Sequence, residues 1–106
     1  MKVYIAGPVS GNPDYRADFA QAAGMLENAG HEILNPATLP GSMDRQNAMR
    51  VCFAMLDTAE CAYFLPGWEH SEGARLERMY CEYVGKQILN IHDKSERILT
   101  AGSGQE

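Results

Sequence analysis

The chain has 106 residues, 45% of them hydrophobic, and a formal net charge of −5 at pH 7. This length predicts one domain with a single core. The acidic balance argues against binding to nucleic-acid polymers or acidic membranes, although a nucleotide needs only a few local donors. The apolar run at the N-terminus is too short for a signal peptide, and no stretch approaches a membrane span of about 20 apolar residues, so we expect a cytoplasmic protein.

The first half of the chain predicts a strand, a helix and a second strand. Residues 2–6 have the composition of a strand, and the Gly-Pro pair that follows ends it. Apolar residues at helical spacing predict a helix over residues 14–29, which a glycine ends. Residues 31–34 are predicted to form a short second strand, and a loop with two prolines follows it.

The second half of the chain repeats this pattern. Residues 43–58 predict a helix with one apolar face, and residues 60–65 predict a buried third strand. A Pro-Gly pair and the single Trp separate this strand from a third helix over residues 71–86, for which Ser71 is a suitable N-cap. Residues 87–91 predict the fourth strand.

The alternation of strands and helices is typical of a parallel sheet with helices on both faces. We therefore predict a three-layer, doubly wound α/β domain of the flavodoxin- or Rossmann-like kind, with four to five parallel strands in the approximate order 2-1-3-4. The domain should span residues 1–93, and residues 94–106 should form a polar C-terminal tail. In this order the first and third strands are neighbours, so the loops after them should face each other across one crevice.

The helix predicted over residues 71–86 places one carboxylate where solvent should be scarce. At about 3.6 residues per turn, four apolar residues share the side that we expect to face the core: Leu76, Tyr80, Tyr83 and Val84. Four charged residues share the opposite side: Arg75, Arg78, Glu82 and Lys86. Glu77 lies at the edge of the core-facing side, near the crevice where open α/β sheets bind ligands. The alternatives are that Glu77 leans out to solvent or pairs with Arg75 or Arg78.

The first strand and two loops hold the other candidates. Gly7, Ser10 and Gly11 precede a helix, where backbone amides can cradle an anion, but a plain β-to-α turn uses the same small residues. Trp68 could stack on a base or cover the edge of the core. Tyr4 could be an ordinary core tyrosine, or its hydroxyl could reach a carboxylate at the start of the third helix.

The cysteines and histidines show no pattern that would bind a metal. Cys52, Cys61 and Cys81 fall within predicted strands or helices, which favours buried, reduced thiols over a disulfide or a metal site. The histidines, at positions 31, 70 and 92, have no ligand-like spacing to one another or to the cysteines. We therefore predict neither a metal nor a cofactor.

Three stretches resemble a known superfamily: Tyr4–Pro8 with Ser10 and Gly11, residues 30–36, and residues 65–77. On these motifs the chain resembles the nucleoside 2-deoxyribosyltransferase-like superfamily. It resembles most closely the small, often phage-encoded branch described as a domain of unknown function (DUF4406). The resemblance covers residues 2 to about 91. It implies cleavage or transfer of the N-glycosidic bond of a nucleoside or a nucleoside 5′-monophosphate.

The resemblance also implies roles for single residues. Glu77 matches the glutamate that attacks the anomeric carbon, Tyr4 matches the tyrosine that holds this nucleophile, and Glu72 matches an acidic residue that orients the sugar. The remaining motif residues are expected to border the substrate: Gly7, Pro8, Ser10, Gly11, Trp68, Ser71 and Gly73. Because related enzymes complete their sites with a neighbouring subunit, a homo-oligomer, at least a dimer, is implied.

One position departs from the pattern of the transferases. They carry an aspartate on the second helix that protonates the leaving base, and the register from the third strand puts Cys52 near that place. A cysteine is a poor substitute for a general acid. The alternatives to an enzyme are a non-catalytic nucleotide-binding module of the same fold and a small oligomeric interaction protein.

Overall fold

The computed structural model describes residues 1–90 and 98–100 as one sheet with three α-helices. The strands, in the order β2-β1-β3-β4-β5, are β1 (Lys2–Ala6), β2 (Glu32–Leu34), β3 (Cys61–Phe64), β4 (Gln87–Asn90) and β5 (Ile98–Thr100). The helices are α1 (Tyr15–Asn28), α2 (Arg45–Thr58) and α3 (Glu72–Val84). Strands β1 to β4 are parallel, which confirms the predicted doubly wound α/β fold and its strand order.

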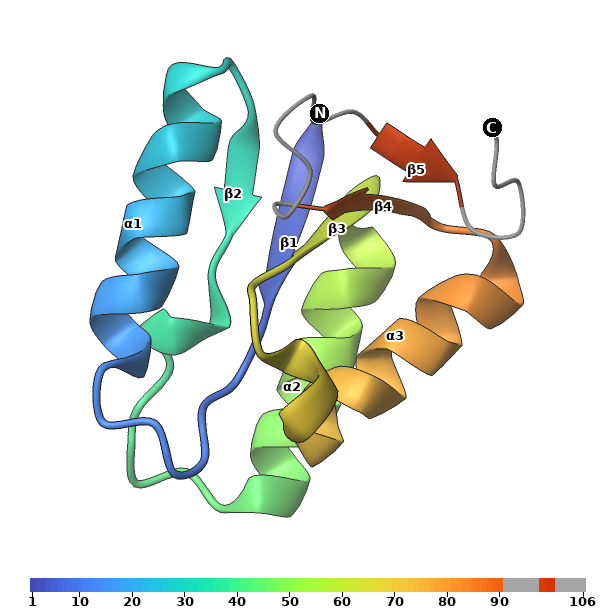
Figure 1. The fold of residues 1–106 in the computed structure, drawn as a ribbon. Coiled ribbons are helices and arrows are strands. Elements are labelled where there is room, and N and C mark those ends of the chain that lie inside the picture. Colours follow the sequence, from blue (N-terminus) through green and yellow to red (C-terminus); the bar gives the residue numbers. More distant parts are fainter. Residues whose placement is uncertain (91–97, 101–106) are drawn as a thin grey trace.

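One helix covers one face of the sheet, and two helices cover the other (Figure 1). Helix α1 packs against the face that includes Val3 and Ile5 of β1. Helices α2 and α3 cover the opposite face, which includes Tyr4 and Ala6. Successive side chains of a strand point to opposite faces, so β1 is buried on both sides. Tyr4 therefore lies in the same layer as α2 and α3.

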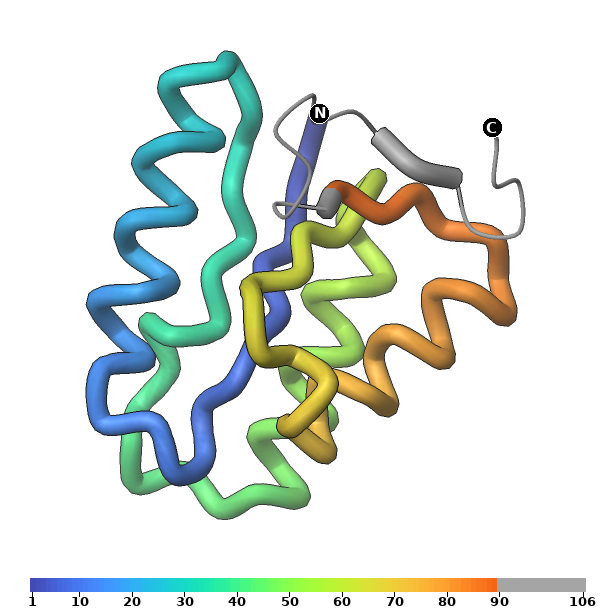
Figure 2. Tube along the Cα trace, viewed as in Figure 1, coloured from blue at the N-terminus to red at the C-terminus, as the bar shows by residue number. Residues whose placement is uncertain are grey.

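The strand register brings the predicted loops to one end of the molecule. Tyr4 pairs with Ala62 and Ala6 pairs with Phe64, so β1 and β3 end at the same level. The backbone amide of Leu65 continues this pairing by donating to the carbonyl of Ala6 at 2.8 Å. The loop after β1 and the first turns of α2 and α3 gather at this end (Figure 2).

Side-chain caps determine where α2 and α3 begin. The carboxylate of Asp44 and the hydroxyl of Ser71 each accept from the backbone amide three residues further on, at 2.8 and 3.3 Å. The Ser71 cap confirms the prediction, whereas α2 begins at Arg45 rather than at residue 43 because Asp44 takes the cap position. Gly85 ends α3 with φ +80°, a left-handed conformation that glycine adopts without a steric penalty.

Helix α3 is turned about its axis relative to the prediction, and of the four expected core residues only Tyr80 packs, partly buried, against the core. The buried residues of the helix are Ala74, Glu77 and Cys81. Three residues of the predicted core side are exposed instead: Leu76, Tyr83 and Val84. The physical reason is size, because the small side chains of Ala74 and Cys81 let the helix lie close to the sheet, which large side chains would prevent.

The predicted polar tail contains a strand. Strand β5 pairs with β4 in the antiparallel sense, so the fifth strand is not parallel and residues 98–100 belong to the sheet. A strand of three residues is too short for alternation to reveal it. The rest of the predicted tail, and the predicted end of the fourth strand at residue 91, lie outside the described residues.

Gly7→Ala should destabilise the fold. A Cβ atom at position 7 would lie 2.9 Å from both Cβ and Cδ1 of Leu65, so the loop or β3 would have to shift. We expect the free energy of unfolding, measured in urea, to fall by about 1–3 kcal/mol. Gly24→Ala in α1 is the control, because its added Cβ meets nothing within 4 Å. Equal effects of the two variants would contradict the close approach at Gly7.

Candidate functional site

A cavity of about 1070 Å³ opens at the carboxyl end of β1, beside the first turns of α2 and α3, at the edge of the sheet where the crevice was predicted. Its wall is largely apolar and includes Tyr15, Phe19, Met49 and Phe53. Seven predicted site residues line it: Tyr4, Gly7, Ser10, Ser71, Glu72, Gly73 and Glu77. An apolar cavity with a few convergent polar groups is the usual form of a small-molecule site.

Two of these polar groups are almost fully buried and bind each other. The hydroxyl of Tyr4 donates to Oε2 of Glu77 at 2.6 Å, and Glu77 is only 5% exposed. The contact joins β1 to α3 and has the length of an ordinary O–H···O hydrogen bond. Glu77 therefore does not lean out to solvent, and the alternative partners are engaged elsewhere. Arg75 donates to the carbonyl of Glu69 and Arg78 to the carboxylate of Glu82.

Burial changes the protonation of both groups. Loss of solvent raises the pKa of Glu77 to about 7, although the hydrogen bond from Tyr4 lowers it. Burial also raises the pKa of Tyr4, and the negative charge of Glu77 raises it further, so the phenol keeps its proton. A carboxylate that ionises near neutral pH beside a fixed donor is suited to act as a nucleophile or a base.

Cys52, on α2, is a third titratable group at this point of the cavity. It is half-buried and lines the cavity. Burial raises the pKa of its thiol, a hydrogen bond with Tyr4 lowers it, and the charge of Glu77 raises it. All three cysteines are free thiols; Cys61 and Cys81 are buried as predicted, whereas Cys52 is only partly so. Cys52 differs from them because it borders the open space next to Tyr4 and Glu77.

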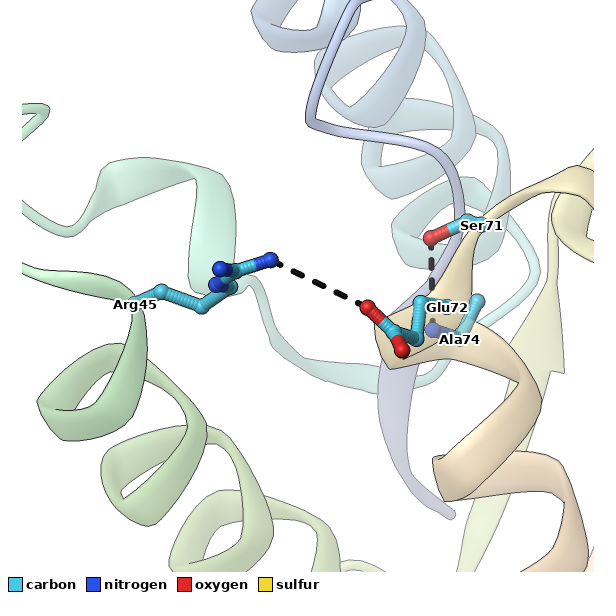
Figure 3. Close-up of polar contacts among 4 residues, drawn as sticks. All are labelled: Arg45, Ser71, Glu72 and Ala74. Atoms are coloured by element: carbon cyan, nitrogen blue, oxygen red, sulfur yellow. Dashed lines mark hydrogen bonds and ion pairs between the residues drawn. The ribbon is translucent and has the colours of Figure 1, made fainter.

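An exposed ion pair joins the first residues of α2 and α3 (Figure 3). Nη1 of Arg45 lies 3.8 Å from Oε1 of Glu72, and both side chains are largely exposed. A pair this open adds little to stability, so the Arg45 guanidinium is available to an anionic ligand.

Four polar residues that line the cavity were not predicted from the sequence: Arg45, Gln46, Arg50 and His70. Arg45 could have been predicted from Asp44, which is a suitable N-cap and makes Arg45 the first residue of α2. A helix that follows β2 begins at the same edge of the parallel sheet as the crevice, so its first residue should lie near the site. His70 borders the cavity from the loop after β3. Arg50 could not have been predicted, because residue spacing alone does not determine which side of α2 faces the cavity.

Three residues predicted to border the substrate do not line the cavity: Pro8, Gly11 and Trp68. Trp68 packs edge-on against Phe64 with ring centroids 5.7 Å apart, which favours the alternative that it covers the core. The Arg78 guanidinium stacks over Trp68 at 4.6 Å from the ring centroid, so Arg78 does not join the solvated charged side predicted for α3. Pro8 lies against the turn after β3, and Gly11, with φ +77°, shapes the turn before α1.

Residues 1–90 and 98–100 contain neither a candidate metal cluster nor a membrane-spanning helix. No group of three or more His, Cys, Asp or Glu side chains in this part of the chain could hold a metal ion. None of the helices described there is long and apolar enough to cross a bilayer. His92, which entered the prediction about metal ligands, lies outside these residues.

Glu77→Gln should stabilise the protein at about pH 8 and change little at about pH 5. The folded-state pKa of about 7 lies above the ordinary value of 4.5, so the folded state binds more protons than the unfolded state between these values. Stability therefore falls as the pH rises through this range. A neutral amide avoids this loss of about 3 kcal/mol, and Tyr4 can still donate to it.

Urea unfolding of both proteins at the two pH values measures this difference. Glu27→Gln is the control, because Glu27 is an exposed carboxylate on α1, and the change should have little effect at either pH. Equal effects of Glu77→Gln at both pH values would show that the carboxylate does not lose solvation on folding.

Comparison with protein families matches residues 1–90 to the family described as a domain of unknown function (DUF4406). The match takes in β1 to β4 and therefore both Tyr4 and Glu77. Comparison with curated proteins found no match. The match covers most of the 106 residues of the chain, and the chain therefore belongs to the DUF4406 family.

Proposed function

We propose that the protein cleaves or transfers the N-glycosidic bond of a nucleoside or a nucleoside 5′-monophosphate, with Glu77 as nucleophile and Tyr4 as its positioning partner. The observation that carries the proposal is the buried hydrogen bond between these residues at the wall of a cavity. The resemblance of the sequence motifs to the nucleoside 2-deoxyribosyltransferase-like superfamily supports the same assignment.

The chemistry requires a carboxylate in this kind of environment. When the bond between sugar and base breaks, its electron pair leaves with the base and positive charge develops on the sugar. The Glu77 carboxylate would attack the anomeric carbon and form a covalent ester with the sugar. Water or a second base would then displace the carboxylate, and the two inversions together retain the configuration. Scarce solvent strengthens the attraction between the carboxylate and the developing charge.

The rest of the cavity suits the two ends of a nucleotide. Its apolar wall, with Tyr15, Phe19 and Phe53, offers surface to a base and a sugar. Arg45 and Arg50 line the same space and carry the positive charge that a 5′-phosphate requires. A phosphorylated substrate is therefore the form that the cavity favours.

The environment of Cys52 favours a second candidate, a nucleotide-binding module without catalysis. The leaving base must gain a proton when the bond breaks. The Cys52 thiol, near the place where the transferases carry their aspartate, has a raised pKa and is therefore a weak donor. In an enzyme with this site, the proton would come from water or from another group at the cavity, such as His70.

The enzyme proposal predicts release of free base, which chromatography of a panel of nucleosides and 5′-monophosphates measures. The rate should rise with pH through about 7 as Glu77 ionises. Glu77→Gln should abolish it. Tyr4→Phe should slow it by about 10- to 1000-fold and move the pH profile upward, because the hydrogen bond that lowers the pKa of Glu77 is lost. Glu27→Gln is the control and should leave the rate unchanged.

A 2-fluoro-arabinosyl analogue of the reactive substrate should trap the intermediate, because fluorine slows its breakdown. Mass spectrometry should find the added sugar on the peptide that contains Glu77 and no adduct on Glu77→Gln. Base release by Glu77→Gln at the parental rate would exclude Glu77 as the nucleophile. Thermal stabilisation by nucleotides without any turnover would favour the binding module instead.

Cys52→Asp should increase base release if protonation of the base limits the rate. A carboxyl group placed beside Glu77 would have a raised pKa from burial and from the neighbouring charge, so it could donate a proton near neutral pH. Cys52→Ser keeps the size of the side chain without adding an acid and should give no increase. The measurement is the same chromatographic rate, and equal rates for both variants would place the proton source elsewhere.

A further inference from the structure

Besides His70, four charged residues line the cavity, two of each sign. Glu72 and Glu77 are negative, and Arg45 and Arg50 are positive. Glu77 is 5% exposed, whereas the other three residues are exposed. The most deeply buried charge is therefore negative, and both positive charges stay near solvent. A ligand with an anionic end toward solvent and a cationic end near Glu77 would meet complementary charges at both ends.

The polar neighbours of Glu77 in this cavity hold their protons firmly. Tyr4 donates to Glu77, and burial together with the charge of Glu77 raises the pKa of its phenol. Cys52 lines the cavity at the same point, and burial raises the pKa of its thiol. The ordinary pKa of a thiol already lies well above that of a carboxylic acid. Neither group readily gives a proton to a base that departs beside Glu77.

The charge of the base decides whether such a proton is needed. When the C1′–N bond of a neutral nucleoside breaks, the electron pair stays on the base, which leaves as an anion unless an acid protonates it. A cationic base, such as a 7-alkylpurine or an N-linked pyridinium ring, takes the same electron pair and leaves as a neutral molecule. Cleavage of a nucleotide of this kind requires a nucleophile but no acid.

We propose that the preferred substrates are nucleoside 5′-monophosphates with a cationic base. The inference rests on the proposed function, because it names the base that Glu77 displaces. A carboxylate oxygen of Glu77 forms a bond to C1′ as the C1′–N bond breaks, and the neutral base departs with the electron pair. Water then displaces the carboxylate, so that its hydroxyl goes to C1′ and its remaining proton goes to solvent.

The cavity offers each end of this substrate a partner. Tyr15 and Phe53 are partly exposed in its wall, and an aromatic ring attracts a cation that lies over its face. A cation close to Glu77 also favours the ionised form of the carboxylate, which is the form that attacks. A neutral base would have neither of these advantages. At the other end, the phosphate would meet Arg45 and Arg50.

Release of base from matched compounds tests the proposal: guanosine 5′-monophosphate and its 7-methyl derivative, each in the ribo and 2′-deoxy form. Chromatography measures kcat/KM, and each value is divided by the spontaneous rate of the same compound, because methylation makes the bond more labile. The acceleration should be at least as large for the 7-methyl compounds. A general acid in the site would instead accelerate the unmethylated compounds more, by about 100- to 10,000-fold, and this result would overturn the proposal. Glu77→Gln should release neither base, which assigns both reactions to this site.

Substitutions at Cys52 test the reason for the preference. Cys52→Asp supplies an acid and should lower the ratio of 7-methylguanine to guanine release by about tenfold or more. Cys52→Ser is the matched control and should keep the ratio of the parent, and circular dichroism should show that both variants fold. A ratio that Cys52→Asp leaves unchanged would overturn the proposal, because protonation of the base would then not limit release.

Two further outcomes separate this proposal from the proposed function. If His70→Gln slows the release of guanine but not of 7-methylguanine, His70 is the acid, and the preference for a cationic base is overturned while the glycosidase proposal stands. If none of the four compounds releases its base, the glycosidase proposal is overturned together with this one.

Discussion

A hydroxyl from the first strand determines whether a carboxylate can stay inside this domain. A buried carboxylate without a partner is costly, and Tyr4 meets Glu77 at 2.6 Å in a layer that solvent hardly reaches. Two packing features make this distance possible. The position of Tyr4 in β1 directs it toward α2 and α3, and the small residues Ala74 and Cys81 let α3 approach the sheet.

The sequence was a good guide to the fold where the pattern concerns backbone order. Strands and helices alternate regularly, and few arrangements of a parallel sheet are compatible with such a chain. The order of β1 to β4 could therefore be predicted from the sequence. The side that α3 buries could not be predicted in this way. Hydrophobicity ranks Leu76 and Tyr83 above Ala74, whereas close packing on the sheet needs the smaller side chain. The short strand β5 depends on pairing with β4 rather than on any local pattern.

In the candidate site, likewise, the contacts that follow from strand order were predicted, and those that depend on packing were not. Tyr4 and Glu77 were expected to meet for two reasons: β1 and β3 are neighbours with α3 following β3, and both residues match motifs of the superfamily that the chain resembles. Trp68 could not be assigned, because its place is decided by Phe64 beneath it and Arg78 above it, which come from different elements. The proximity of Cys52 to Tyr4 and Glu77 likewise depends on how α2 lies across the sheet.

The position of β1 at the start of the chain has a consequence for synthesis. Its neighbour β3 begins at Cys61, and the residue that Tyr4 binds lies 73 positions further on. During translation, β1 therefore leaves the ribosome well before β3 and α3 are made, although its other neighbour β2 follows sooner. Contacts this distant in sequence form slowly, and the nascent chain is open to misassembly until they do. The Tyr4–Glu77 contact at the cavity can form only after α3, which supplies Glu77, has been made.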